Sequence, residues 1–457
     1  MKIVILGAGA VGSTLATLLS EENDIVLVDH NSAVLGHIEE VADLKTILGS
    51  CSYPNILVKA GIADADMVVA VTGSDETNIV ACMVSRVLNK SIKTIARVRE
   101  ASYLKGKTKA AMESGEIPID VHVSPEQLIT DQIQDLIDTP GSLQVIRFGN
   151  NQLDLVAVRA VLGGPMIGHE IGDLKKHLQK IDSRIVAIFR KGESIVPTGL
   201  TKIEVEDEVF FISKKGESTK VINEMRPKVE KYSNVIIAGG GKIGSRIAKA
   251  IEKNHNVKII ESGEDRAKEL SEKLLSSIVL QGSVSDKALL HDENIENTDF
   301  FVAVTNDDEA NVMSCLLAAE MGVRKVIALI SNPAYVDLVQ GKGIGIDIAI
   351  APSQITIGTF LAEIEGKDVV QVHSLRKGAA EAIEAIAHES PSGKDSAIGK
   401  ELGELRLPEG ATIGAIIRDD KGKIAHDHVH LRENDHVIVF LTDKKYLQEV
   451  KNIFSPK

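Results

Sequence analysis

The residues of this sequence that are best suited to chemistry form two glycine-rich turns, each followed by an acidic residue. The first turn, Gly7–Gly12 (GAGAVG), directly follows the apolar segment Ile3–Leu6, and Asp29 lies 17 positions after Gly12 (29 − 12). In a turn of this type the first glycine permits a tight bend, the second lets a pyrophosphate approach the backbone, and the third lets a helix pack on a strand. The expected helix, Ser13–Ser20, then presents free N–H groups to the phosphates.

The acidic residue at the end of the second strand distinguishes between nucleotides. The Asp29 carboxylate can accept hydrogen bonds from ribose hydroxyls, and its charge repels a 2′-phosphate, which favours NAD(H) or adenosine nucleotides over NADP(H). The second turn, Gly239–Gly244 (GGGKIG), has Glu261 in the same place. Its Lys242 either helps to hold phosphate or is a solvated loop lysine. The alternative, a glycine turn with a surface acid, is disfavoured by the complete strand–turn–helix context.

A polar segment follows the predicted fourth strand of the first half. Thr72 ends this strand beside the expected nucleotide crevice and could bond ribose or phosphate. The alternative role of the segment is a helix cap, in which Ser74 or Asp75, together with Asn78, starts the helix Ile79–Leu88. We expect one of these residues to be a cap whatever Thr72 does.

The next strand of the first half ends at Arg97, whose guanidinium fork could reach a phosphate across the crevice. The corresponding residue of the second half is Leu329. Either Arg97 is a surface residue, or the two sites bind different ligands or bind with different strength. We favour the second interpretation, which predicts a sensor with two unequal sites.

These motifs occur twice because the chain is an internal duplication. Gly12 and Gly244 differ by 232 positions (244 − 12), and VVAVTGSDETN at 68–78 recurs as FVAVTNDDEAN at 301–311, at an offset of 233 (301 − 68). Several blocks in one order at near-constant offset do not arise by chance. Three further pairs follow in the same order: 117–127 with 344–354, 184–190 with 412–418, and 207–213 with 435–442.

The order of strand, helix and turn signals in each half predicts two kinds of domain. Strand and helix patterns alternate from residue 1 to about 118, as a parallel α/β sheet requires. A helical stretch, Ser124–Leu136, then leads through a Pro-Gly turn to short alternating strands. We therefore expect an α/β protein with two Rossmann-like doubly wound domains, each followed by a small α+β C-subdomain. The predicted boundaries are 1–120 and 232–352 for the nucleotide-binding subdomains, 140–224 and 368–457 for the C-subdomains, and 225–231 for the linker.

Composition excludes several classes of protein. The net charge of −13 and the aromatic content of 3% argue against a nucleic-acid binder. The three cysteines are scattered without a CxxC pair, which disfavours a zinc site or a disulfide framework and suits a reducing cytosol. No signal peptide is recognisable, and the apolar runs are too short to cross a bilayer. We expect a soluble protein that reaches a membrane only through a partner.

The double arrangement resembles the regulatory proteins of Trk-type potassium uptake, which are built from two RCK (KTN) units. The resemblance spans essentially the whole chain. It rests on GAGAVG with Asp29, DADMVVAVTGSDETN at 64–78, IARVR at 95–99, FVAVTNDDEAN at 301–311, AYVDLVQG at 334–341 and DHVIVFLTDKKYL at 435–447.

The resemblance implies a function and a set of site residues. It implies a cytoplasmic, peripheral subunit on the inner face of the cell membrane, assembled as a homo-oligomeric ring. This ring would gate a membrane-embedded potassium-translocating subunit of the TrkH/TrkG type, with NAD(H) and ATP or ADP as ligands and no metal. By position, the first site comprises Gly7, Ala8, Gly9, Ala10, Val11, Gly12, Asp29, Ser50, Thr72, Gly73 and Arg97, and the second comprises Gly239, Gly240, Gly241, Lys242, Ile243, Gly244, Glu261, Ser283 and Thr305.

An NAD-dependent oxidoreductase is the alternative function for a Rossmann fingerprint. Hydride transfer needs a substrate domain with a positioned acid or base, and the C-subdomains offer only scattered histidines that we expect to be solvated. We therefore expect no catalytic residue and a ligand-operated regulator rather than an enzyme. The histidines are His169, His177, His388, His426, His428 and His430.

Overall fold

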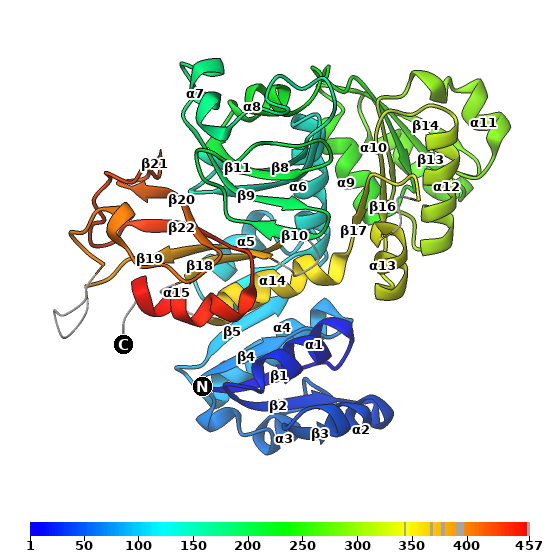
Figure 1. Ribbon diagram of the computed structural model, residues 1–457. Helices are drawn as coiled ribbons and strands as arrows, with labels where there is room; N and C mark the ends of the chain where they lie inside the picture. The colour runs from blue at the N-terminus through cyan, green and yellow to red at the C-terminus, as the bar shows by residue number, and fades with distance from the viewer. Residues whose placement is uncertain (342–343, 366–368, 376–379, 390–396, 455–457) are drawn as a thin grey trace. The chain divides into compact units, whose positions relative to one another are not determined.

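The computed structural model describes residues 1–341, 344–365, 369–375, 380–389 and 397–454 (Figure 1). The chain divides into two compact units, one of Met1–Leu128 with Pro352–Ile364, the other of Ile129–Ala351 with Glu365–Lys457. Each unit contains one six-stranded parallel sheet, and the second also contains two five-stranded antiparallel sheets. The predicted fold class is confirmed.

The sheet of the first unit is doubly wound, with the strand order β3-β2-β1-β4-β5-β6. Its central strands are short aliphatic runs with almost every residue buried, as expected when helices cover both faces. The order reverses between β1 and β4, so the carboxyl ends of these two strands border the crevice where such sheets bind ligands. The strands are β1 Lys2–Leu6, β2 Asp24–Asp29, β3 Lys45–Leu48, β4 Met67–Ala70, β5 Lys93–Arg97 and β6 Val121–Val123, and the helices are α1 Ala10–Leu19, α2 Ser32–Val41, α3 Pro54–Lys59, α4 Asp75–Leu88 and α5 Gly106–Glu113.

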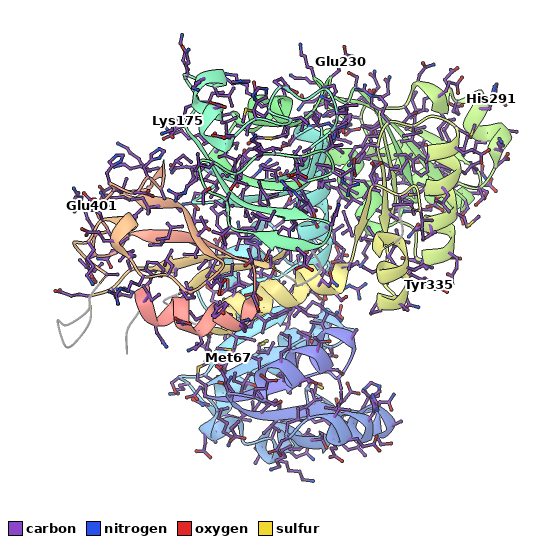
Figure 2. All side chains as sticks on the ribbon, viewed as in Figure 1. Met67, Lys175, Glu230, His291, Tyr335 and Glu401 are labelled. Carbon is purple, nitrogen blue, oxygen red and sulfur yellow. The ribbon has the colours of Figure 1, made fainter. Side chains whose placement is uncertain are left out.

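The parallel sheet of the second unit repeats this topology with the order β14-β13-β12-β15-β16-β17. Side-chain pairs repeat with it: Tyr335, labelled in Figure 2, donates to Glu309 over 2.7 Å, and Tyr103 lies 3.5 Å from Glu76 in the first unit. The strands are β12 Asn234–Ala238, β13 Asn256–Glu261, β14 Ile278–Gln281, β15 Phe300–Ala303, β16 Val326–Leu329 and β17 Ile348–Ile350, and the helices are α9 Lys242–Ile251, α10 Glu264–Lys273, α11 Lys287–Asp292, α12 Asp308–Glu320 and α13 Pro333–Gly341.

The helices that follow the two parallel sheets do not stay with the unit of the sheet they follow, α14 almost wholly and α6 in its greater part. Helix α14 (Pro352–Glu365, yellow in Figure 1) follows the second sheet, yet its Phe360 and Ile364 are buried in the core of the first unit, and the Lys93 ammonium donates to the Glu363 carbonyl over 2.6 Å. Helix α6 (Pro125–Asp138) follows the first sheet, yet from Ile129 onward it belongs to the second unit, where Asp138 lies 4.0 Å from His255. The helix predicted at Ser124–Leu136 is confirmed to within two residues at its carboxyl end.

The two C-subdomains are antiparallel sheets with equivalent strand orders, β7-β8-β11-β9-β10 and β18-β19-β22-β20-β21. Each contains a buried bidentate ion pair at the same place, Arg190 with Asp207 at 2.8 Å and Arg418 with Asp435 at 2.6 Å. The strands are β7 Ser142–Phe148, β8 Leu153–Arg159, β9 Ser183–Arg190, β10 Glu193–Ile195, β11 Glu208–Lys214, β18 Val369–Leu375, β19 Ala380–Ile386, β20 Ala411–Arg418, β21 Lys421–Ile424 and β22 His436–Leu441, and the helices are α7 Leu174–His177, α8 Ser218–Met225 and α15 Leu447–Phe454.

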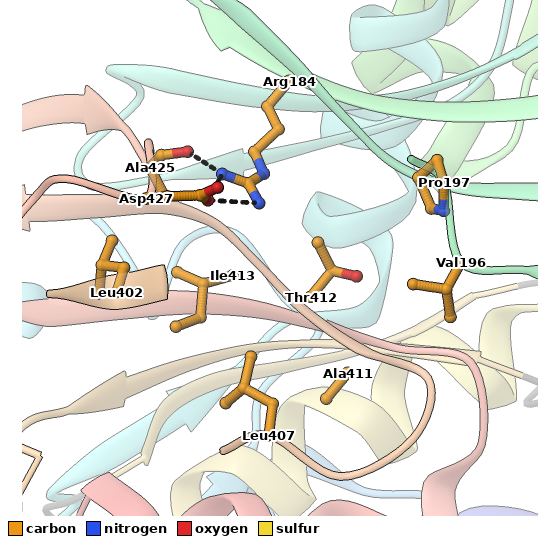
Figure 3. Close-up of a pocket in the computed structure, with 10 residues that line it drawn as sticks. All are labelled: Arg184, Val196, Pro197, Leu402, Leu407, Ala411, Thr412, Ile413, Ala425 and Asp427. Carbon is orange, nitrogen blue, oxygen red and sulfur yellow. Dashed lines mark hydrogen bonds and ion pairs between the residues drawn. The ribbon is translucent and has the colours of Figure 1, made fainter. Parts of the chain in front are cut away.

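The two antiparallel sheets share one hydrophobic core. The rings of Phe210 and Phe440, one from each sheet, lie with centroids 5.2 Å apart. At the edge of this junction Arg184 bonds the Ala425 carbonyl and the Asp427 carboxylate beside a cavity of about 180 Å³ (Figure 3). The C-subdomains are therefore a single packed pair within the second unit.

Candidate nucleotide-binding sites

The three glycines of the first loop occupy different surroundings. Gly7 adopts a φ of +106°, and a Cβ there would lie 2.9 Å from the Thr72 nitrogen. A Cβ at Gly12 would lie 1.8 Å from the Gly7 carbonyl oxygen, whereas one at Gly9 would meet nothing within 4 Å. Glycine at 7 and 12 is thus needed for packing, and Gly9 leaves the face of the loop open to a ligand.

Helix α1 begins at Ala10, inside the motif, and not at the predicted Ser13. The prediction was wrong because the glycine at position 12 does not interrupt the helix: its missing side chain is what permits contact with the Gly7 carbonyl. The free N–H groups of the first turn therefore belong to the motif itself, next to the open position at Gly9.

Asp29 ties the glycine loop to the end of β2. Its carboxylate is buried and accepts from the Ala8 nitrogen at 2.6 Å and from the Asn31 nitrogen at 2.9 Å. The Ser50 hydroxyl, half-buried at the end of β3, lies 3.5 Å from that of Ser52. Burial, with a further contribution from the Asp29 charge, raises the pKa of the adjacent Cys51 thiol to about 12, so this cysteine remains a protonated packing residue.

The loop after β4 is held by Asn78, a residue whose role the sequence analysis missed. The fully buried Asn78 amide accepts from the Thr72 nitrogen at 2.9 Å and from the Thr72 hydroxyl at 2.7 Å, and it donates to the Arg97 carbonyl at 2.9 Å. It therefore joins the carboxyl ends of β4 and β5. The available signal was an asparagine at the same place in both repeats, Asn78 and Asn311.

The expected cap of helix α4 is Ser74, whose hydroxyl accepts from the Thr77 nitrogen at 3.1 Å. The prediction that Asn78 helps to start a helix at Ile79 was wrong, since α4 already begins at Asp75. Asp75 itself receives the backbone nitrogens of Arg99 and Glu100 at 2.9 and 2.7 Å, and so fixes the segment after β5.

Arg97 lies half-buried at the edge of the first crevice rather than on the open surface. Its Nη2 donates to the Thr72 carbonyl over 2.6 Å, while its buried Nε has no hydrogen-bond partner among the described residues. Burial, followed by the charge of Arg99, lowers the pKa of this guanidinium. Next to it, Gly73 leaves open space where a side chain would stand.

The second crevice repeats the backbone arrangement of the first. Gly239 has a φ of +108°, a Cβ at Gly244 would lie 1.9 Å from the Gly239 carbonyl, and Gly241 faces open space. Glu261 accepts from the nitrogens of Gly240 and Gly263 at 2.8 and 2.7 Å, just as Asp29 does in the first crevice.

The strand ends of the second crevice follow the same plan with different side chains. Thr305 donates its hydroxyl to Asn311 at 2.7 Å, and Asn311 donates to the Leu329 carbonyl at 2.9 Å. Leu329 is buried and apolar, so no guanidinium occupies the place of Arg97. The Ser283 hydroxyl accepts from the Ser285 nitrogen at 3.2 Å, and Lys242 is exposed at the first position of α9.

Arg266 is a second residue that the sequence analysis missed. From the first turn of α10 its Nε donates to the Gly240 carbonyl at 2.8 Å, so its guanidinium lies on the second glycine loop. No repeat signal could have found it, because the corresponding residue of the first half is Val34.

The histidines are arranged for packing and pairing. His177 is exposed, as expected, and lies 2.9 Å from the Glu224 carboxylate, whereas His426 is half-buried and lies 2.9 Å from that of Asp182. The ring of His426 also stacks on that of His428 at a centroid distance of 5.9 Å. Within the described ranges, no three histidine, cysteine or acidic side chains form a group that could hold a metal ion.

Comparison with protein families places the chain among known proteins. The TrkA-N domain matches residues 3–125 and 235–352, and the TrkA-C domain matches residues 155–226 and 391–455. The chain is 48% identical to the Trk system potassium uptake protein TrkA of Halomonas elongata, over 99% of this chain and 98% of that protein. The chain belongs to the TrkA family. It is also 46% identical to the protein of the same name from Vibrio alginolyticus, over 100% of this chain and 99% of the relative.

Solved structures share the fold of this TrkA-family chain. The crystal structure of the GsuK RCK domain superposes with a TM-score of 0.62 at 20% identity, over 98% of this chain and 94% of that chain. The GsuK channel bound to NAD gives a TM-score of 0.60 at 19% identity, over 100% of this chain and 79% of that chain. In the part of the TrkA-family chain that the structure describes, no helix is both long and apolar enough to span a membrane.

Proposed function

We propose that this TrkA-family chain is a nucleotide-binding regulatory subunit that gates a Trk-type membrane potassium transporter or channel in response to NAD(H) and adenine nucleotides. The observation on which the proposal rests is the pair of glycine loops, each with an open central glycine and an acid that accepts a loop amide and holds the loop in place. Both loops are preorganised for a pyrophosphate, which NAD(H), ADP and ATP share.

The roles of the side chains follow from their places in the crevices. Asp29 and Glu261 would accept ribose hydroxyls with the lone pairs that the backbone amides leave free. The amides at the open glycines and the first turns of α1 and α9 would hold the phosphates, and the positive charge of Arg97 at the crevice edge would attract a phosphate in the first site. Thr72 and Thr305 would bond ribose or phosphate at the strand ends.

A dehydrogenase is the weaker alternative. Hydride transfer needs an acid or base at the nicotinamide. The histidine next to the first site, His30, lies 3.2 Å from Asp29 with 87% of its side chain exposed, which is the adenosine end of the crevice. The names of the relatives, potassium uptake proteins, also favour regulation.

Assembly into a homo-oligomeric ring is part of the proposal. Helix α4 exposes the apolar side chains of Val80, Met83 and Val87 to 43, 42 and 80%, at the i, i+3, i+7 spacing of one helix face. Exposed apolar stripes of this kind mark surfaces that other proteins cover. The ring would lie in the cytoplasm on the inner face of the membrane, bound to the potassium-translocating subunit of the TrkH/TrkG type.

Gating requires that a nucleotide bind one arrangement of the ring more tightly than another, because a ligand shifts an equilibrium only by its differential affinity. The two C-subdomains are packed on one core, so they are suited to transmit a rearrangement as one body. Nucleotides that bound both arrangements equally would leave the pore unchanged.

The test uses the purified full-length chain and its membrane partner. NADH and ATP should each raise the melting temperature, and neither should be consumed when NADH is offered with a panel of small carbonyl compounds. A potassium-translocating membrane protein should co-purify with the chain, and its potassium flux in liposomes should change on adding nucleotide. Steady NADH oxidation would contradict the proposal, as would a flux that is indifferent to the chain and its nucleotides.

A further inference from the structure

The second glycine loop carries a guanidinium that the first does not. In the first loop the Ala8 carbonyl accepts the Ser13 hydroxyl at 2.7 Å. In the second loop the corresponding carbonyl, that of Gly240, accepts Nε of Arg266 at 2.8 Å, and the Ser245 hydroxyl turns to the Lys242 carbonyl at 3.2 Å. A neutral hydrogen bond of the first site is thus replaced by a charged one in the second.

One donor of Arg266 is held only loosely. Its Nη2 lies 3.5 Å from the Gly241 carbonyl and 3.4 Å from the Ser245 hydroxyl, both longer than an ordinary N–H···O bond. Its Nη1 is held firmly by Glu269 at 2.6 Å. Nη2 is therefore the donor that an incoming phosphate would recruit.

The acid of the second loop, Glu261, has its counterpart in Asp29 of the first loop, so the charge that distinguishes the second loop comes from Arg266 and its neighbours. Glu269 is shared between Arg266 and Lys273, so this group of three side chains has one net positive charge. Glu264 and Asp265, on the same turn of α10, are exposed and screened by water. Lys242 adds a second cation at the start of α9, where the first loop has Ala10.

We infer that Arg266 is a specificity-determining residue of the second site, where it selects adenine mononucleotides with a free terminal phosphate over the dinucleotide NAD⁺. This inference rests on the proposed nucleotide-binding function. ADP carries about two more negative charges than NAD⁺ near pH 7, so a guanidinium at the loop stabilises bound ADP more. The first site has Val34 in place of Arg266 and its arginine, Arg97, at the strand end across the crevice.

The test measures ADP and NAD⁺ binding to the second site alone. Gly9→Val closes the first site in all proteins used, because a side chain there meets nothing in the protein and fills the face open to ligand. In this background Arg266→Val, which copies Val34, should weaken ADP binding about tenfold, the effect of one charge-assisted hydrogen bond, and NAD⁺ binding less than about threefold. Calorimetry at about 50 and 300 mM salt should show a smaller salt dependence of ADP binding in Arg266→Val.

Two matched variants distinguish the effect of the Arg266 charge on binding from its effect on the conformation of the glycine loop. Arg266→Lys keeps the charge and should keep the preference for ADP, whereas Arg266→Gln keeps hydrogen bonding and should lose the preference. If Arg266→Val weakened the binding of ADP and NAD⁺ equally, or left both affinities unchanged, the inference would be overturned. Arg266 would then only stabilise the loop. If neither nucleotide binds either site of the unsubstituted chain, the proposed function itself fails.

Discussion

The two crevices of this protein share a backbone and differ in their charges. Both have an acid that accepts the amide of the second loop residue, and both have a threonine and an asparagine that join two strand ends. The fixed cations differ, since the first crevice has Arg97 at a strand end and the second has Arg266 at the glycine loop. The groups that hold the backbone are thus the same in the two halves, because each satisfies polar backbone atoms, while the arginines beside the two crevices differ in position.

The largest effect should come from breaking one glycine loop and leaving the other intact. Gly12→Ala places a methyl group against the Gly7 carbonyl, 1.8 Å away, so the loop or α1 must shift. We expect a loss of about 3 kcal/mol in the free energy of unfolding and no nucleotide binding at the first site. Chemical denaturation and calorimetry measure both.

Gly9→Ala is the matched control for this loop. Gly9 has an ordinary φ of −68° and open space around it, so the stability should stay within about 0.5 kcal/mol. A Gly9→Ala protein that unfolds as easily as Gly12→Ala would refute the distinction between packed and ligand-facing glycines.

The retained backbone plan predicts equal effects in the two halves. Asn78→Ala and Asn311→Ala each remove the side chain that accepts a threonine backbone nitrogen and donates to a strand-end carbonyl. Each should cost about 2 kcal/mol, measured by urea denaturation. A loss of stability in only one of the two variants would show that the two asparagines do not stabilise their strand ends equally.

The arginine that only the first crevice has predicts an effect on nucleotide binding at the first site alone. Arg97→Leu, which copies Leu329, should weaken nucleotide binding at the first site about tenfold with little loss of stability, since the unpaired Nε is removed together with the charge. Binding is measured in a Gly241→Val background that closes the second site. Undiminished affinity would make Arg97 a structural residue only.

The smallest expected effect is a pH dependence of stability that comes from His373, a residue of the second C-subdomain. His373 lies edge-on to Phe148 at a centroid distance of 5.4 Å, and burial lowers the pKa of its imidazole to about 4. A depressed histidine pKa means that the unfolded chain binds a proton more readily, so stability is complete above about pH 6.5 and falls as the pH drops towards 4. We expect a loss of about 1 kcal/mol at pH 6.

The control for this pH dependence comes from the other half of the chain. His373→Ile copies Ile146, the residue at the same place in the first C-subdomain, and should flatten the change of melting temperature between pH 7 and pH 5. Identical slopes for both proteins would remove His373 as the cause.

Much of both sites could be predicted from local sequence. The glycine spacing, the acid after the second strand and the polar strand ends are short-range patterns, and the structure places Gly7, Asp29 and Thr72 around one loop as those patterns indicate. The start of α1 was missed because a glycine inside a helix was interpreted as a turn residue. Asn78 was missed because its partners, the ends of β4 and β5, meet only when the sheet forms.

The sequence by itself determined the duplication, the fold class and the two glycine loops, because each depends on the order and spacing of residues along the chain. Only the tertiary structure decided which sheet each closing helix covers and where Arg266 lies. Helix α14 is apolar on most of its sides, and its place is decided by the packing of Phe360 and Ile364 in the core of the first unit. Likewise, Arg266 reaches the glycine loop only because α9 and α10 lie on the same sheet, a proximity that no local pattern encodes.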